Sequence, residues 1–262
     1  MKKTIIALML AGVSATAAAD SSYVTGNVQF HDSDLHGADV TSTVEIGHTF
    51  DNSFGGFTIL AEIDGVQMAG IADKDVMSYK PVGKDRSFGV GEDQTVWAKY
   101  DTGLNTADKR KPYLTIGLEQ SFEITDNLYA AVGYHHLSQD GETVQHRPLV
   151  KLGYNFDSGL FISNRTRAQI SLDSRETIYV EEVGLVQRDI DSKTEVRLDN
   201  AIGYNFNSVQ VKYNNVYLTD AELMDHEVRV TYIGADVQPY IEYRNQADDA
   251  NNAIVVGASY GF

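Results

Sequence analysis

The chain has no cysteine, only 4 prolines and no apolar run after its N-terminal segment that is long enough to form a transmembrane helix. Without cysteine, it cannot be a small secreted domain stabilised by disulfides. A helix needs about 20 consecutive apolar residues to span a bilayer, so helical membrane proteins are excluded. Basic residues are also scarce, and the net charge of −16 argues against nucleic acid as a partner, because binding to phosphates requires a basic patch.

The chain is rich in aromatic residues, and its apolar and polar residues alternate. Hydrophobic residues make up 42% of it, yet mean hydropathy is only −0.27, because apolar and polar residues alternate. Its 15 tyrosines, 10 phenylalanines and 22 glycines suit twisted antiparallel strands. Alternation of this kind, with lipid on one side and water on the other, is typical of transmembrane β-barrels.

The C-terminal segment shows the alternation most clearly. Its apolar face consists of Ile254, Val256, Ala258, Tyr260 and Phe262, and the intervening residues are small or weakly polar. An ordinary sandwich strand is the alternative. The terminal Phe262, with Tyr260 two residues before it, indicates the assembly signal that the barrel assembly machinery reads in bacterial outer-membrane barrels.

The N-terminus predicts export through the Sec pathway. Lys2 and Lys3 precede the short apolar core Thr4–Val13, and Ala17–Ala19 provides small residues before a cleavage site at Asp20. A membrane anchor is the alternative, but the core is too short to span a bilayer. We therefore expect residues 1–19 to be cleaved and residues 20–262 to form one barrel domain in the bacterial outer membrane.

Alternating segments predict an all-β, antiparallel barrel of twelve strands. Five tight turns rich in Asp, Asn, Gly and Ser lie at one end, with both termini, and longer polar loops lie at the other. The 67–112 connection is either an extracellular extension or hairpin, or a loop folded into the lumen. A competing count of fourteen strands uses Arg86–Val90 and Thr95–Asp101. The twelve predicted strands are Tyr23–His31, Val40–Phe50, Phe57–Val66, Tyr113–Phe122, Leu128–Leu137, Arg147–Phe156, Leu160–Ile170, Thr194–Phe206, Val209–Leu218, Glu227–Ile233, Gln238–Arg244 and Ala253–Phe262.

Strand parity places the charged residues on the lumen side, since a charge facing lipid at the midplane costs roughly 2–4 kcal/mol. The last strands carry the basic lining and the first four carry an acidic side, which predicts either a narrow channel or a barrel filled by ion pairs. The basic residues are Arg147, Lys151, Arg165, Arg167, Arg197, Lys212, Arg229 and Arg244. The acidic side consists of Glu45, Glu62, Asp64 and Glu119. The strands that carry the basic lining also contain four carboxylates: Glu195, Asp199, Glu227 and Glu242.

Four short segments resemble the oligogalacturonate-specific porin family: His48–Asn52, Tyr154–Leu160, His226–Val230 and Pro239–Tyr243. The likeness is clearest from Tyr113 to the end, and 67–112 is unmatched. The resemblance implies a small monomeric twelve-stranded channel for acidic sugars, with the eight basic residues as its lining. The abundant luminal carboxylates and the negative net charge depart from that pattern.

These observations predict a porin for passive diffusion of small hydrophilic solutes, with oligosaccharides as the expected class. Arg165, Arg167, Arg197 and Arg229 would form a track for carboxylated or polar sugars, because guanidinium groups bind carboxylates. We expect outer-membrane lipid and lipopolysaccharide as surroundings and no catalytic residues, cofactor or resident metal ion. Two alternatives remain open: a barrel hydrolase using His135 with Ser138, and a structural or adhesive barrel without an open pore.

Overall fold

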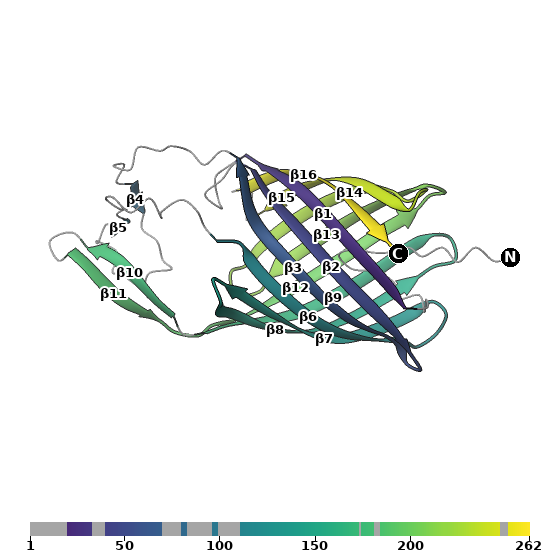
Figure 1. The fold of residues 1–262 in the computed structure, drawn as a ribbon, viewed down its shortest axis with the longest axis horizontal. Coiled ribbons are helices and arrows are strands. Elements are labelled where there is room, and N and C mark those ends of the chain that lie inside the picture. Colours follow the sequence, from purple (N-terminus) through teal and green to yellow (C-terminus); the bar gives the residue numbers. More distant parts are fainter. Residues whose placement is uncertain are drawn as a thin grey trace.

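Twelve strands form a closed antiparallel barrel in the computed structural model, which describes residues 20–32, 40–69, 80–82, 96–98, 111–172, 174–180, 184–246 and 251–262 (Figure 1). Along the barrel wall, strands pair in chain order, and β1 closes the barrel against β16. The barrel strands are β1 (Ser21–His31), β2 (Val40–Asn52), β3 (Gly55–Ala69), β6 (Tyr113–Glu123), β7 (Leu128–Gln139), β8 (Glu142–Asn155), β9 (Leu160–Ser171), β12 (Thr194–Asn205), β13 (Val209–Leu218), β14 (Leu223–Tyr232), β15 (Val237–Gln246) and β16 (Asn251–Gly261).

The predicted twelve-stranded transmembrane barrel is confirmed, and the fourteen-strand alternative is wrong. The strand β5 (Val96–Ala98) falls within the extra run Thr95–Asp101, but it joins a separate four-stranded sheet instead of the wall. That sheet has the order β11-β10-β5-β4 and contains β4 (Lys80–Val82), β10 (Ser174–Val180) and β11 (Gly184–Ile190). Its strands lie beyond the barrel end opposite the C-terminus (Figure 1).

Several predictions fall outside the described residues. The signal segment 1–19 is one, and the predicted strand Arg86–Val90 is another. Most of the 67–112 connection also lies outside them, so its placement relative to the lumen stays a prediction. Among the described residues, no helix is long and apolar enough to cross a membrane.

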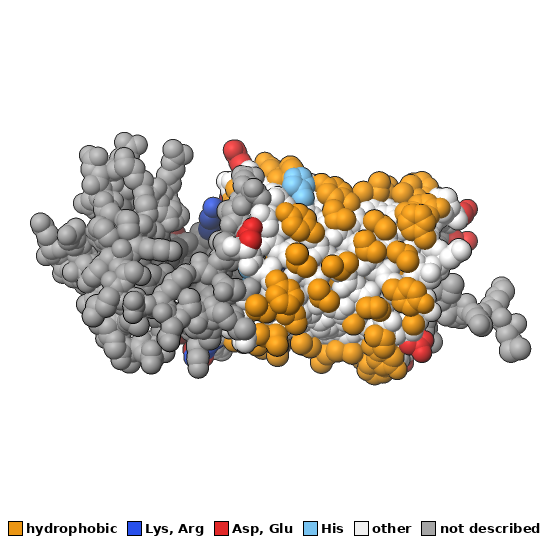
Figure 2. Space-filling model, turned by 90° about the horizontal axis from the view of Figure 1, so that it is seen from above, with side chains coloured by type: hydrophobic (Ala, Val, Ile, Leu, Met, Phe, Trp, Pro, Cys, Tyr) orange, Lys and Arg blue, Asp and Glu red, His pale blue; other side chains and the backbone are white. Residues whose placement is uncertain are grey.

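The outer face of the wall is apolar because alternate side chains point to lipid. Ile46, Ile202 and Ile254 are 54%, 48% and 50% exposed, whereas the adjacent Val255 is fully buried on the inner side. Figure 2 shows hydrophobic side chains spread over the visible face of the wall, with acidic side chains near its ends. Aromatic pairs gather at the end that carries the tight turns: Tyr154–Phe156, Tyr204–Phe206 and Tyr260–Phe262 have ring centroids 4.7, 4.7 and 5.6 Å apart. They form the aromatic girdle expected at a membrane interface.

Strand β1 begins, and strand β16 ends, at the end of the barrel that carries the tight turns. There the backbones of Ser22 and Phe262 exchange two hydrogen bonds of 2.8 and 2.9 Å, which extend the β1–β16 pairing to the last residue. Gly159 completes one of these turns with a φ of +93°. A side chain there would also meet the carbonyl oxygen of Asn205, since a Cβ would lie 2.7 Å from it.

At the other end of the β1–β16 pairing, Asp32, the residue after β1, contacts Asn252 of β16. Its carboxylate accepts the backbone N–H of Asn252 at 2.7 Å and the side-chain amide of Asn252 at 2.9 Å. These hydrogen bonds hold the pKa of the Asp32 carboxyl below its ordinary value, because they stabilise the charged form. Contacts between β1 and β16 therefore close the barrel wall along its whole height.

Candidate functional site

The inner face of the wall carries the charged residues that the sequence predicts. Burial alternates with the exposed apolar positions, so Arg167, Lys212 and Arg229 are each at most 8% exposed and lie on the interior side. Arg147, Lys151, Arg165, Arg197 and Arg244 share this inner parity on β8, β9, β12 and β15. The interior therefore brings cations from β8 to β15 together along one side of the barrel.

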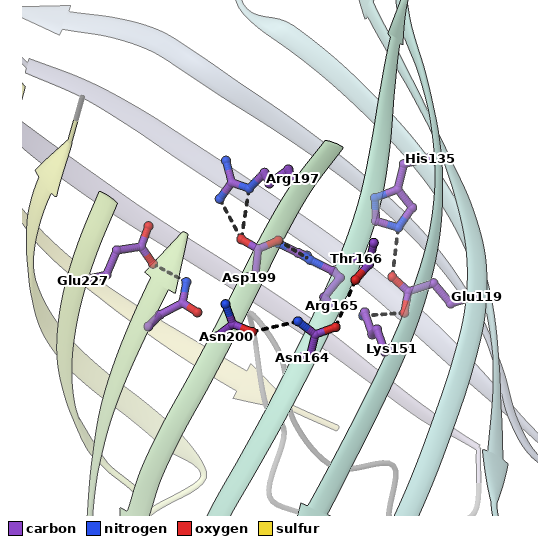
Figure 3. A network of polar contacts seen from close by, with 11 residues as sticks. Glu119, His135, Lys151, Asn164, Arg165, Thr166, Arg197, Asp199, Asn200 and Glu227 are labelled. Carbon is purple, nitrogen blue, oxygen red and sulfur yellow. Dashed lines mark hydrogen bonds and ion pairs between the residues drawn. The ribbon is translucent and has the colours of Figure 1, made fainter. Parts of the chain in front are cut away.

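Asp199 on β12 is the centre of one ion-pair cluster in this wall (Figure 3). It accepts the Nε–H of Arg165 at 2.9 Å, and Arg197 donates to it from Nε at 2.9 Å and Nη2 at 2.8 Å. The pairing follows from register, because Asp199 lies directly opposite Arg165 across β9 and β12. One carboxylate thus faces two guanidinium groups, which leaves a local positive excess.

Glu242 on β15 holds a second cluster and is fully buried. It accepts Nε–H bonds from Arg229 at 2.6 Å and from Arg244 at 2.5 Å. Arg244 also donates to Gln29 at 3.2 Å, and its Nε lies 4.0 Å from Glu227. The Arg229 guanidinium lies 4.2 Å from the ring centre of Tyr240, a cation–π contact. These contacts fix both arginines against the wall.

Glu119 on β6 forms a third cluster, with Lys151 at 2.5 Å and His135 at 2.9 Å (Figure 3). His135 faces inward and is 6% exposed. Ser138, the nucleophile of the hydrolase alternative, has the opposite parity and donates to the backbone oxygen of Leu114. His135 and Ser138 therefore lie on different faces of β7, which does not match the serine–histidine geometry of a hydrolase.

Arg147 and Arg167, hereafter the arginine pair, differ from the other cations. Within the described residues, no carboxylate lies at ion-pair distance from either one. Arg147 donates from Nε to the amide oxygen of Gln145 at 2.8 Å, and the buried Nε of Arg167 has no partner in the described structure. Arg167 is directly opposite Arg197 in the β9–β12 register, so like charges face each other. The arginine pair is therefore positive charge in the barrel interior without a direct carboxylate partner among the described residues.

The acidic side consists of Glu45 on β2, Glu62 and Asp64 on β3, and Glu119 on β6, which pairs with Lys151 as described above. Glu45 accepts the hydroxyl proton of Tyr23 at 2.7 Å, and Asp64 accepts one from Thr43. Glu62 interacts electrostatically with both members of the arginine pair. Acidic and basic sides therefore face each other across the interior, and a polar solute between them would experience a transverse field.

The sequence reasoning did not anticipate the neutral partners of these charges. His135, Tyr23 and Gln29 each bind a luminal charge or lie beside one, and each has the inward parity that the strand pattern predicts. Parity would have identified them as interior residues. Only the strand register shows which charges they contact.

No family model matches the chain, and no curated protein matches it. Among solved structures, the chain is similar to the KdgM porin in complex with disordered oligogalacturonate, with 14% identity, a TM-score of 0.59 and coverage of 92% of this chain and 99% of that one. A second structure of the KdgM porin gives 14% identity, the same coverage and a TM-score of 0.57. The CymD monoaromatic hydrocarbon channel is also similar, with 6% identity, a TM-score of 0.52 and coverage of 94% and 88%. The family resemblance indicated by the short segments is thus confirmed at the level of the fold: this chain shares the β-barrel fold of the KdgM porin.

Proposed function

We propose that this protein is a porin of the bacterial outer membrane that lets small hydrophilic solutes diffuse passively, with acidic oligosaccharides among them. The observation that carries the proposal is the arginine pair: Arg147 and Arg167 are positive groups in the barrel interior without a carboxylate partner among the described residues. Lipid and lipopolysaccharide surround the barrel, and the barrel assembly machinery inserts it by recognising Phe262. One chain closes the whole wall, so each monomer forms its own lumen.

The chemistry of this site suits a carboxylated sugar. A guanidinium group donates two parallel N–H bonds to a carboxylate, and neither guanidinium of the arginine pair has a carboxylate partner among the described residues. The negative charge of Glu62, which interacts electrostatically with both arginines, weakens the attraction of the site for an anion. Weak binding of this kind favours passage, since a solute has to leave the site as well as enter it.

The sequence-based track also included Arg165, Arg197 and Arg229. In the structure, Asp199 and Glu242 pair with these arginines. Their charge is partly neutralised, so we assign them to the positive potential of the wall. The arginine pair supplies the positive charge that no carboxylate among the described residues pairs with.

The test replaces Arg147 and Arg167 together with Gln and measures reversal potential in planar bilayers under a salt gradient. We expect the potential to shift toward cation selectivity and uptake of acidic oligosaccharides to slow, while uptake of small neutral sugars stays unchanged. Lys111→Gln is the matched control, because Lys111 is an exposed cation that pairs with Asp140 outside the strands. If the double variant keeps the selectivity and uptake of the wild type, the arginine pair is not a solute site.

A barrel without an open pore is the second candidate, favoured by the three ion-pair clusters around Asp199, Glu242 and Glu119. Such clusters fill the lumen of small barrels. The same recordings separate the two functions, because a filled barrel produces no conductance steps in the wild-type protein.

A further inference from the structure

Two histidines lie side by side on the outer face of the wall, one on β7 and one on β8. His136 and His146, hereafter the histidine pair, are directly opposite each other in the register of these strands, and their ring centroids are 5.6 Å apart. His136 shares its parity with Val132 and Tyr134, which are 50% and 40% exposed. The histidine pair therefore belongs to the outer face of the barrel and not to the lumen.

The histidine pair lies near the barrel end opposite the tight turns. His136 is three residues from the end of β7 at Gln139, which is about 10 Å along the strand. Only the short turn of Asp140 and Gly141, both with positive φ, separates β7 from β8. Both imidazole rings are partly exposed, so an ion from the surrounding water can reach them.

Each ring has one nitrogen in contact with a neighbouring side chain. Nδ1 of His146 contacts the hydroxyl of Tyr134, whose ring stacks on the imidazole with centroids 6.0 Å apart. Nε2 of His136 lies 3.5 Å from the hydroxyl oxygen of Thr143. In the part of the chain that the structure describes, no protein group hydrogen-bonds to Nε2 of His146 or to Nδ1 of His136. Each imidazole thus keeps one nitrogen for a ligand.

We propose that the histidine pair binds one divalent transition-metal ion of the zinc class on the outer face of the barrel. Imidazole is a preferred ligand of such ions. Two imidazoles on one tetrahedral zinc ion have ring centroids roughly 5 Å apart, because each Zn–N bond is about 2.0–2.1 Å long. The separation of 5.6 Å therefore needs only a small adjustment of the two side chains. Tyr134 positions the ligand, because a proton on Nδ1 of His146 that is donated to its hydroxyl leaves Nε2 to bind the ion.

Two protein ligands make an exchangeable site. Among the described residues, no group of three or more His, Asp or Glu side chains could hold a metal ion, so water completes the coordination of an ion bound to the histidine pair. The ion would join β7 to β8 and would stabilise the folded barrel, because the two ligands come together only when these strands pair. The site faces away from the lumen, so it does not depend on the proposed transport.

His226 on β14 provides a matched control. Its Nδ1 lies 2.7 Å from the hydroxyl of Tyr213, and the two rings stack with centroids 6.1 Å apart, which repeats the tyrosine contact of the histidine pair. The residues opposite His226 are Asn215 on β13 and Asn245 on β15. His226 therefore has the tyrosine but no second imidazole across the strands.

The experiment titrates Zn²⁺ into the folded barrel, purified in detergent without a histidine tag, and follows binding by calorimetry. We expect one ion per chain for the wild type and for His226→Gln. Outer-shell partners contribute roughly 10–100-fold to metal affinity, so Tyr134→Phe should weaken binding by that factor, and His136→Gln with His146→Gln should weaken it further. Excess Mg²⁺ should not displace the zinc, because Mg²⁺ prefers oxygen ligands.

A second measurement follows the urea midpoint of the heat-modifiable form with and without Zn²⁺. Zinc should raise the midpoint of the wild type and leave that of the double histidine variant unchanged, because only the folded wild-type barrel binds the ion. The proposal is overturned if the wild type binds no zinc, if the double variant binds it as tightly as the wild type, or if His226→Gln loses binding. An equal rise of the midpoint in wild type and double variant would also overturn it.

Discussion

Replacing Asp199 with Asn should destabilise the barrel and make its lumen more anion-selective. Asp199 has a side chain only 7% exposed and accepts three N–H bonds, one from Arg165 and two from Arg197. Breaking a buried ion pair costs about 3–5 kcal/mol when an uncompensated charge is left behind. Arg165 and Arg197 are 20% and 24% exposed, so water screens part of that cost, and the Asn oxygen still accepts a hydrogen bond. We expect a loss of roughly 2–3 kcal/mol in the free energy of unfolding.

The assay follows the folded, heat-modifiable form of the refolded protein across a urea gradient. Glu142→Gln is the control, because Glu142 is an exposed carboxylate and the first residue of β8. The control removes the same charge and should leave the urea midpoint unchanged. Equal midpoints for Asp199→Asn and Glu142→Gln would refute the assignment of Asp199 as a buried counterion. An unchanged reversal potential in Asp199→Asn would refute its influence on the lumen.

Two further predictions concern assembly and packing. Deleting Phe262 should lower the yield of folded barrel in outer membranes more than Phe262→Ala does, because deletion also removes the two backbone hydrogen bonds to Ser22. Immunoblots of unheated samples measure the two yields, and equal yields would contradict the prediction. Gly203→Ala should lower the free energy of unfolding by about 1–3 kcal/mol, because the new Cβ would lie 2.2 Å from the Phe161 ring and 2.7 Å from a backbone oxygen. Gly26→Ala is the control: its Cβ would meet no atom closer than 3.8 Å, so urea titration should show no change in stability.

The barrel strands could be predicted because lipid and lumen impose opposite polarity on adjacent residues. The predicted strand Val209–Leu218 matches β13 at both ends, and the other strands differ mainly in length at their ends. Strand β14 begins at Leu223, four residues before the predicted Glu227, because its first residues lie near the barrel end, where the polarity contrast fades. The hairpin of β10 and β11 was missed because it lies beyond the barrel end, where the rule of alternating lipid and lumen faces does not apply.

The charged lining could be predicted only in part. Parity places Arg167 and Arg197 on the same face of the wall, but it does not show that they stand opposite each other, nor that Asp199 is shared between Arg165 and Arg197. Such pairings depend on register between strands that lie far apart in the sequence.

The most direct test of the central claim is a single-channel recording of the purified wild-type protein in a planar bilayer under a salt gradient. The account predicts discrete, stable conductance steps whose reversal potential shifts toward cations when Arg147 and Arg167 are both replaced with Gln. Absence of conductance steps from correctly folded, heat-modifiable protein would contradict it and leave the ion-pair clusters as the filling of a closed barrel.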